Sequence, residues 1–127
     1  MSFGADLRTK LLGLAGGRVY WEYRPQNTPL PAIVLHEINS PLDQTFDGPM
    51  GTQGERVQAD CMTKTKVEAW ALRDAVTAAL IAPGMTGATE FQGGTINLRR
   101  PVKEDTPDGV VHTFQIDATI WWCAAVS

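Results

Sequence analysis

The sequence is poor in cysteine and has no excess of positive charge. Its 127 residues include two cysteines, Cys61 and Cys123, which lie far apart and show no CxxC spacing. A disulfide framework or a cysteine-rich metal site is therefore not expected, and two buried thiols are the ordinary interpretation. The net charge is −3, so the composition gives no electrostatic footprint for gripping a phosphate backbone.

Long hydrophobic runs are also missing. The opening stretch MSFGADLRTKLLGLAGG has one short apolar patch broken by charges, which fits neither a secretory signal nor a membrane span. Hydrophobic residues make up 43% of the chain and charged residues 20%, the usage of an ordinary globular domain. We therefore expect a single domain over residues 1–127 that folds in the cytoplasm and contacts no membrane.

Catalytic motifs are absent as well. His36 and Glu37 match the start of the zinc-protease pattern HExxH, but the second histidine is replaced by Ser40. Adjacent residues on a strand point to opposite faces, so a surface histidine beside a solvated glutamate is expected here. The sequence has no GxSxG, Walker or GxGxxG pattern and no metal-ligand spacing. We expect no catalytic residue, no cofactor and no metal.

Turn residues divide the rest of the sequence into a helix, three strands, a second helix and two strands. The expected helices span about residues 6–14 and 66–82, and the expected strands span 18–23, 32–38, 55–65, 95–100 and 110–122. Hairpin-type connections between these strands predict an α+β fold: a mostly antiparallel sheet of about five strands with two helices packed on one face.

The second helix has the clearest signals. Thr65 and Glu68 form a capping-box pattern, in which hydroxyl and carboxylate each accept a hydrogen bond from a backbone N–H. Pro83 and Gly84 end the helix. The residues expected in its apolar stripe are Ala69, Leu72, Val76, Ala79 and Leu80. The residues expected to face water are Lys66, Arg73, Asp74 and Thr77.

Residues 39–54, NSPLDQTFDGPMGTQG, form a long connection rich in glycine, proline and aspartate. Structureless connections of this length are uncommon in compact domains and usually serve function or motion. We therefore expect a long mobile loop at 39–54.

Tryptophan and arginine indicate contacts with other proteins. Trp21, Trp121 and Trp122 all fall on expected strands, and the adjacent pair must point to opposite sheet faces. Tryptophan is enriched at interface hot spots, which favours oligomerisation, with core packing an equal alternative for Trp21 and Trp122. The basic pair Arg99 and Arg100 is expected to meet a protein rather than a nucleic acid.

Several local patterns, taken in order, resemble the tail-completion or tail-terminator proteins of long-tailed bacteriophages and gene transfer agents. They are the leucine-rich first helix, RVY, a proline-rich segment entering LPAIVL, the long loop, VQADCMTKTKVEAWALRDAVTAAL, and the closing NLRRPV and HTFQIDATIWW. The resemblance covers nearly the whole chain.

The resemblance implies a virion protein without enzymatic activity, assembled in the host cytoplasm. Such a protein forms a hexameric ring at the head-proximal end of the tail tube, contacts the tube protein and a head-tail connector or adaptor, and lets DNA pass without specific binding. On this hypothesis the loop faces the tube or the lumen and certain side chains contact neighbouring subunits. These residues are Asp43, Gln44, Phe46, Asp47 and Met50 in the loop, and Arg99, Arg100 and Trp121 at the subunit interface.

Two alternatives stay open. One is another ring of the same neck, such as a stopper or head-completion protein. The other is a small oligomeric α+β enzyme or ligand-binding domain with its pocket beneath the loop at 39–54, which would need convergent polar groups and a perturbed titratable residue.

Overall fold

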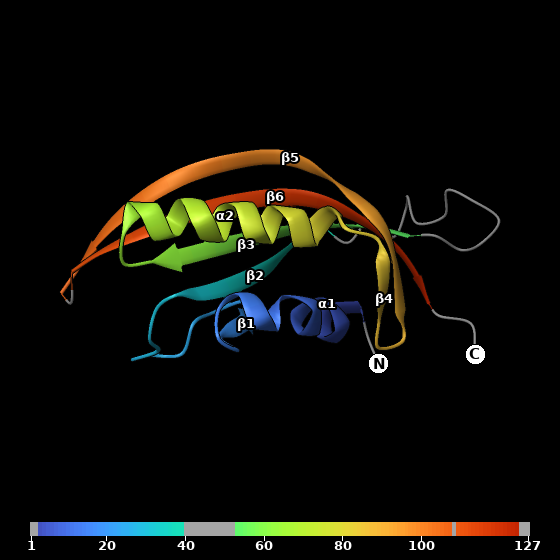
Figure 1. The fold of residues 1–127 in the computed structure, drawn as a ribbon, viewed down its shortest axis with the longest axis horizontal. Helices are drawn as coiled ribbons and strands as arrows, with labels where there is room; N and C mark the ends of the chain where they lie inside the picture. The colour runs from blue at the N-terminus through green and yellow to red at the C-terminus, as the bar shows by residue number, and fades with distance from the viewer. Residues whose placement is uncertain (1–2, 40–52, 108, 125–127) are drawn as a thin grey trace.

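Six strands form one sheet, and two helices pack against one of its faces (Figure 1). The computed structural model describes residues 3–39, 53–107 and 109–124. Strand neighbours are antiparallel except β1 and β2, which are parallel, and the order across the sheet is β1-β2-β3-β6-β5-β4. The elements are α1 (Phe3–Leu11), a 3-10 helix η1 (Leu12–Leu14), β1 (Val19–Trp21), β2 (Ala32–Asn39), β3 (Gln53–Thr63), α2 (Lys66–Ile81), β4 (Gly84–Thr86), β5 (Thr89–Thr106) and β6 (Gly109–Ala124).

The core fills the space between the helices and the sheet. Alternation along the central strands points Leu35, Val57 and Ile116 to the same face. Leu7 of α1 and Val76 of α2 belong to the same cluster, and all five side chains are at most 1% exposed. In Figure 1, β5 and β6 arch over α2, while α1 lies beside β1 and β4. The predicted α+β class and the mostly antiparallel sheet are confirmed.

The prediction of about five strands was wrong, because residues 83–94, expected to be a connection, contain the strand β4 and the start of β5. Gly87, with φ of 57°, lies in the tight turn between β4 and β5, and β4 pairs with Thr89–Phe91. β5 then continues through the segment expected to be a turn, since β6 offers it a ladder partner as far as Thr106. The expected strand 95–100 is therefore the middle of one long hairpin arm.

The start of the chain also differs from the expectation. The first helix spans Phe3–Leu11 and ends in η1, rather than running over 6–14. β1 stops at Trp21 because Glu22 has a positive φ of 74°, which breaks an extended strand. Residues 22–31 then return the chain to the end where β1 began, and β2 pairs with β1 in parallel.

The predicted cap of α2 is confirmed, with one change. The Thr65 hydroxyl accepts a hydrogen bond from the Glu68 backbone N–H at 3.2 Å. The Glu68 carboxylate accepts from the Thr65 hydroxyl at 3.0 Å, rather than from the backbone. Two expected water-facing side chains are also partly covered: the Arg73 guanidinium lies 4.9 Å from the centre of the Phe114 ring, and the Thr77 hydroxyl is buried.

Candidate functional site

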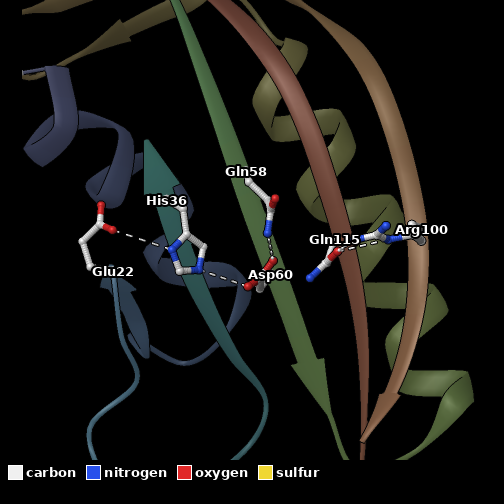
Figure 2. Close-up of polar contacts among 6 residues, drawn as sticks. All are labelled: Glu22, His36, Gln58, Asp60, Arg100 and Gln115. Carbon is white, nitrogen blue, oxygen red and sulfur yellow. Dashed lines mark hydrogen bonds and ion pairs between the residues drawn. The ribbon is translucent and has the colours of Figure 1, made fainter. Parts of the chain in front are cut away.

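The sheet face opposite the helices carries a polar network that crosses β2 and β3 (Figure 2). His36 Nε2 lies 3.1 Å from Asp60 Oδ2, and its Nδ1 lies 3.7 Å from a carboxylate oxygen of Glu22. Gln58 donates a hydrogen bond to the other Asp60 oxygen at 2.8 Å. His36 is thus held between two carboxylates, while Glu37 points to the opposite face, as strand alternation requires.

The network continues on β6 and β5. Arg56 donates two hydrogen bonds to Asp117, at 3.0 and 2.7 Å, and Asn97 donates to the same carboxylate at 3.3 Å. The Arg56 bonds hold the pKa of Asp117 below its ordinary value, and the Asn97 bond acts in the same direction. Arg100 donates to Gln115 across the β5–β6 ladder (Figure 2). The polar side chains of this network pair with one another, an arrangement that favours a rigid surface over a reaction centre.

A pocket of about 860 Å³ lies at one end of the sheet, on the helix side, where α1 begins. Its apolar walls include Phe3 and Trp122, whose rings stack with centroids 5.1 Å apart. The lining also contains Arg8, Glu37, Glu55 and Glu22, and of these the Glu22 carboxylate meets His36 on the polar face. Arg8 Nε donates to a backbone carbonyl at 2.7 Å and forms no ion pair with these carboxylates. The pocket, which we call the acidic pocket, therefore combines aromatic surface with uncompensated negative charge.

Two polar atoms in the acidic pocket are buried without a partner in the described part of the chain. They are Oε2 of Glu55 and the indole Nε1 of Trp122. Burial raises the pKa of Glu55 above its ordinary value, and the charge of Glu37 raises the pKa further. Buried polar groups are nearly always hydrogen-bonded in folded proteins, so an acceptor and a donor left open in one pocket indicate a missing partner.

A second hollow, of about 430 Å³, lies at the opposite end of the sheet, beside the β5–β6 turn. Its apolar lining includes Leu30 and Val110, and the charged residues among its described lining are Arg24 and Lys64. Arg24 donates one hydrogen bond to a backbone carbonyl, at 3.0 Å, and exposed Lys64 has no ionic or hydrogen-bonding partner among the described residues. We call this hollow the basic groove. Thr63 at the end of β3, adjacent to Lys64, pairs with His112, whereas Gln53 at its start pairs with Trp122 of the acidic pocket.

Over residues 3–39, 53–107 and 109–124 the structure contains no cluster of three or more histidine, cysteine or acidic side chains able to hold a metal. None of the helices in these ranges is long and apolar enough to cross a membrane. Cys61 and Cys123 are free, buried thiols, as expected. Burial raises the pKa of Cys61 far above its ordinary value, and the charge of Asp60 acts the same way, which makes this thiol unreactive.

Comparison with protein families gives a match over almost the whole chain. The model described as tail completion protein gp17 matches residues 6–122. The chain belongs to this family. The match overlaps both helices and every strand of the described sheet, and the resemblance inferred from local patterns is thereby confirmed.

A solved structure described as "Virion of native gene transfer agent (GTA) particle" contains a chain of similar fold. The TM-score is 0.56 with 14% sequence identity, and the alignment covers 96% of each chain. At this identity the likeness concerns the fold. No curated protein sequence matches the chain. Family and fold together support a structural component of a phage-like tail for this chain.

The structure does not bring together the three side chains expected at a subunit interface. Arg99 faces the helix side, with its guanidinium 3.8 Å from Asp74 of α2. Arg100 faces the polar side, where it bonds Gln115. Trp121 lies at the far end of β6, with its ring packed so closely over Gly54 that a Cβ there would come within 2.7 Å. The expected loop residues Asp43, Gln44, Phe46, Asp47 and Met50 lie outside the described residues.

The acidic pocket was missed at the level of sequence, although part of its signal is present there. Glu37 and Glu55 each lie two residues from a core position, Leu35 and Val57, so alternation puts both carboxylates on the core face. No local pattern shows that Trp122, from the other end of the chain, joins them.

Proposed function

We propose that this protein is a tail completion protein that forms a hexameric ring, caps the tail tube and joins it to the head. The family match over residues 6–122 carries the proposal. The gene transfer agent virion, which has a chain of the same fold, supports a place in an assembled particle. On this proposal the protein works in the virion tail and performs no chemical reaction.

The charge distribution is compatible with a ring around a DNA path. Six copies would carry a net charge of −18, six times the −3 of one chain. Negative walls repel the phosphate backbone and let DNA slide through without binding. On the polar sheet face, the basic side chains Arg56 and Arg100 are engaged by Asp117 and Gln115 and are poorly placed to hold phosphates.

Within the ring, we propose that the loop at 39–54 meets the tail tube or the lumen. Asp43, Gln44, Phe46, Asp47 and Met50 are the contact residues of this proposal. Arg99, Arg100 and Trp121 are the proposed subunit contacts. Arg100 and Trp121 lie on the polar face of the sheet, whereas Arg99 lies on the helix side, beside α2. A neighbouring subunit that contacts all three must therefore reach both sides of β5.

Measuring the mass of the purified protein in solution, alone and mixed with the tail tube protein, tests the proposal. We expect six-subunit rings, free or bound at one end of the tubes, and electron microscopy of the mixture should show capped tubes of uniform length. A chain that stays monomeric in both samples would contradict the proposal. Binding to a portal or adaptor protein but not to tubes would instead indicate a stopper or head-completion protein.

A further inference from the structure

We propose that the acidic pocket receives Lys64 of a neighbouring copy of this chain. The inference rests on the proposed ring and assigns the contact by which successive subunits join. A ring of identical subunits needs a heterologous interface, formed by two different surfaces that complement one another. The acidic pocket and the basic groove are two such surfaces on one molecule.

The two surfaces lie at opposite ends of the same strand. Glu55 is near the start of β3 and Lys64 directly follows its end. Nine residues of extended chain separate them, about 30 Å at 3.3 Å per residue. Figure 1 shows this arrangement, with the start of α1 at one end of the molecule and the start of α2 and the β5–β6 turn at the other. Lys64 therefore cannot reach the pocket of its own subunit.

The chemistry of the acidic pocket selects a cationic side chain. The Glu37 and Glu55 carboxylates share the lining with one arginine, Arg8, which pairs with neither of them. The unpartnered Glu55 carboxylate can accept a hydrogen bond from an ammonium group, and the rings of Phe3 and Trp122 offer apolar surface for a lysine stem and aromatic surface for its charge. An incoming backbone carbonyl beside the lysine can accept from the open Trp122 N–H.

We assign Lys64, which borders the basic groove, as the occupant. Its ammonium is exposed and has no partner in the described part of its own chain, and none of the described residues that line the basic groove carries a carboxylate. Lys66, two residues on, lies 5.8 Å from the centre of the Trp70 ring, and Lys10 already bonds the Ala82 carbonyl. The docking therefore uses a cation that the fold leaves free.

Charge reversal on each surface gives a decisive test. E55K and K64E should each fail to assemble, because each variant places like charges at every subunit contact. An equimolar mixture should assemble again, because both contacts of an alternating ring then pair a lysine with a glutamate. This rescue also shows that both variants fold. E55Q should weaken assembly about 30-fold or more, as is usual when one partner of a desolvated charge pair is removed.

Carbodiimide coupling of wild-type rings adds a direct measurement. It joins a carboxylate and an amine in contact, and mass spectrometry should identify a Glu55–Lys64 or Glu37–Lys64 peptide pair between subunits. K64R keeps the charge but cannot be coupled, so it should assemble and give no such pair.

Rings that form equally well in E55K, K64E and wild type, with no coupled pair, would overturn this inference and leave the proposed function standing. A coupled pair between Glu55 and the tube protein would overturn it too, by assigning the pocket to the tube contact. Wild-type chains that remain monomeric with and without tubes would instead refute the proposed function.

Discussion

Asp6 is a buried carboxylate whose hydrogen bonds tie α1 to the β4–β5 turn. It is 1% exposed and accepts from the Thr89 hydroxyl at 2.6 Å and from the Ala88 backbone N–H at 3.2 Å. D6A leaves both donors unpaired inside the protein, so we expect it to lower the free energy of unfolding by about 1–3 kcal/mol. Urea unfolding measures the loss, and T9A, which removes an exposed helix-surface hydroxyl, is the control. Equal stability of D6A and T9A would show that the bonds are dispensable.

Glu55 should reduce the stability of the unassembled subunit at neutral pH. Its pKa is raised in the folded state from an ordinary value of 4.5, by burial and by the charge of Glu37. The folded state therefore binds this proton more tightly than the unfolded state, and the contribution of Glu55 to stability falls as pH rises from about 4.5 through the raised pKa. E55Q should be more stable than wild type at pH 7 and close to it at pH 4, measured by urea unfolding below the assembly concentration. A less stable E55Q at pH 7 would contradict the assignment.

At the scale of elements, α2 offers two threonines with opposite expected effects. Thr65 caps the helix through its hydroxyl, so T65A should destabilise the protein by about 1 kcal/mol. Thr77 buries a hydroxyl that has no partner among the described residues, so T77V, of nearly the same shape, should be neutral or stabilising by up to about 1 kcal/mol. Thermal unfolding of both variants checks the contrast. Destabilisation by T77V would indicate a hydroxyl partner that the structure does not show.

The same elements show why some of the fold could be predicted and some could not. The cap of α2 depends on residues three apart, and alternation along β3 and β6 depends on neighbours, so both can be read from local sequence. The length of β5 depends on β6: PVKEDTPDG has the composition of a turn, yet its first six residues, as far as Thr106, pair because a partner strand runs beside them. Pro101 is accommodated because β5 has no neighbour on its outer side beyond Phe91 in the described sheet. The parallel pairing of β1 and β2 depends on a return path that no local pattern encodes.

At the scale of the whole molecule, the positions of the charged side chains in space could not be predicted from the sequence. Composition gives a net charge of −3, which by itself predicts mutual repulsion between copies. The fold separates that charge into an acidic pocket at one end and a basic groove at the other. Neither can be inferred from composition, because each gathers residues from distant segments. Whether copies attract or repel is therefore decided by tertiary structure.

Salt dependence of assembly distinguishes these two electrostatic effects. The centres of neighbouring subunits of this size lie about 30 Å apart, and the Debye length is about 10 Å at 0.1 M salt, so repulsion between net charges is already screened there. Contacts between the acidic pocket and Lys64 act at a few ångströms and still respond as salt rises further. Assembly should therefore weaken between 0.1 and 0.5 M sodium chloride, measured by sedimentation velocity, and the alternating mixture of E55K and K64E should weaken in the same way. Assembly that does not weaken over this range of salt would contradict a contact between the acidic pocket and Lys64.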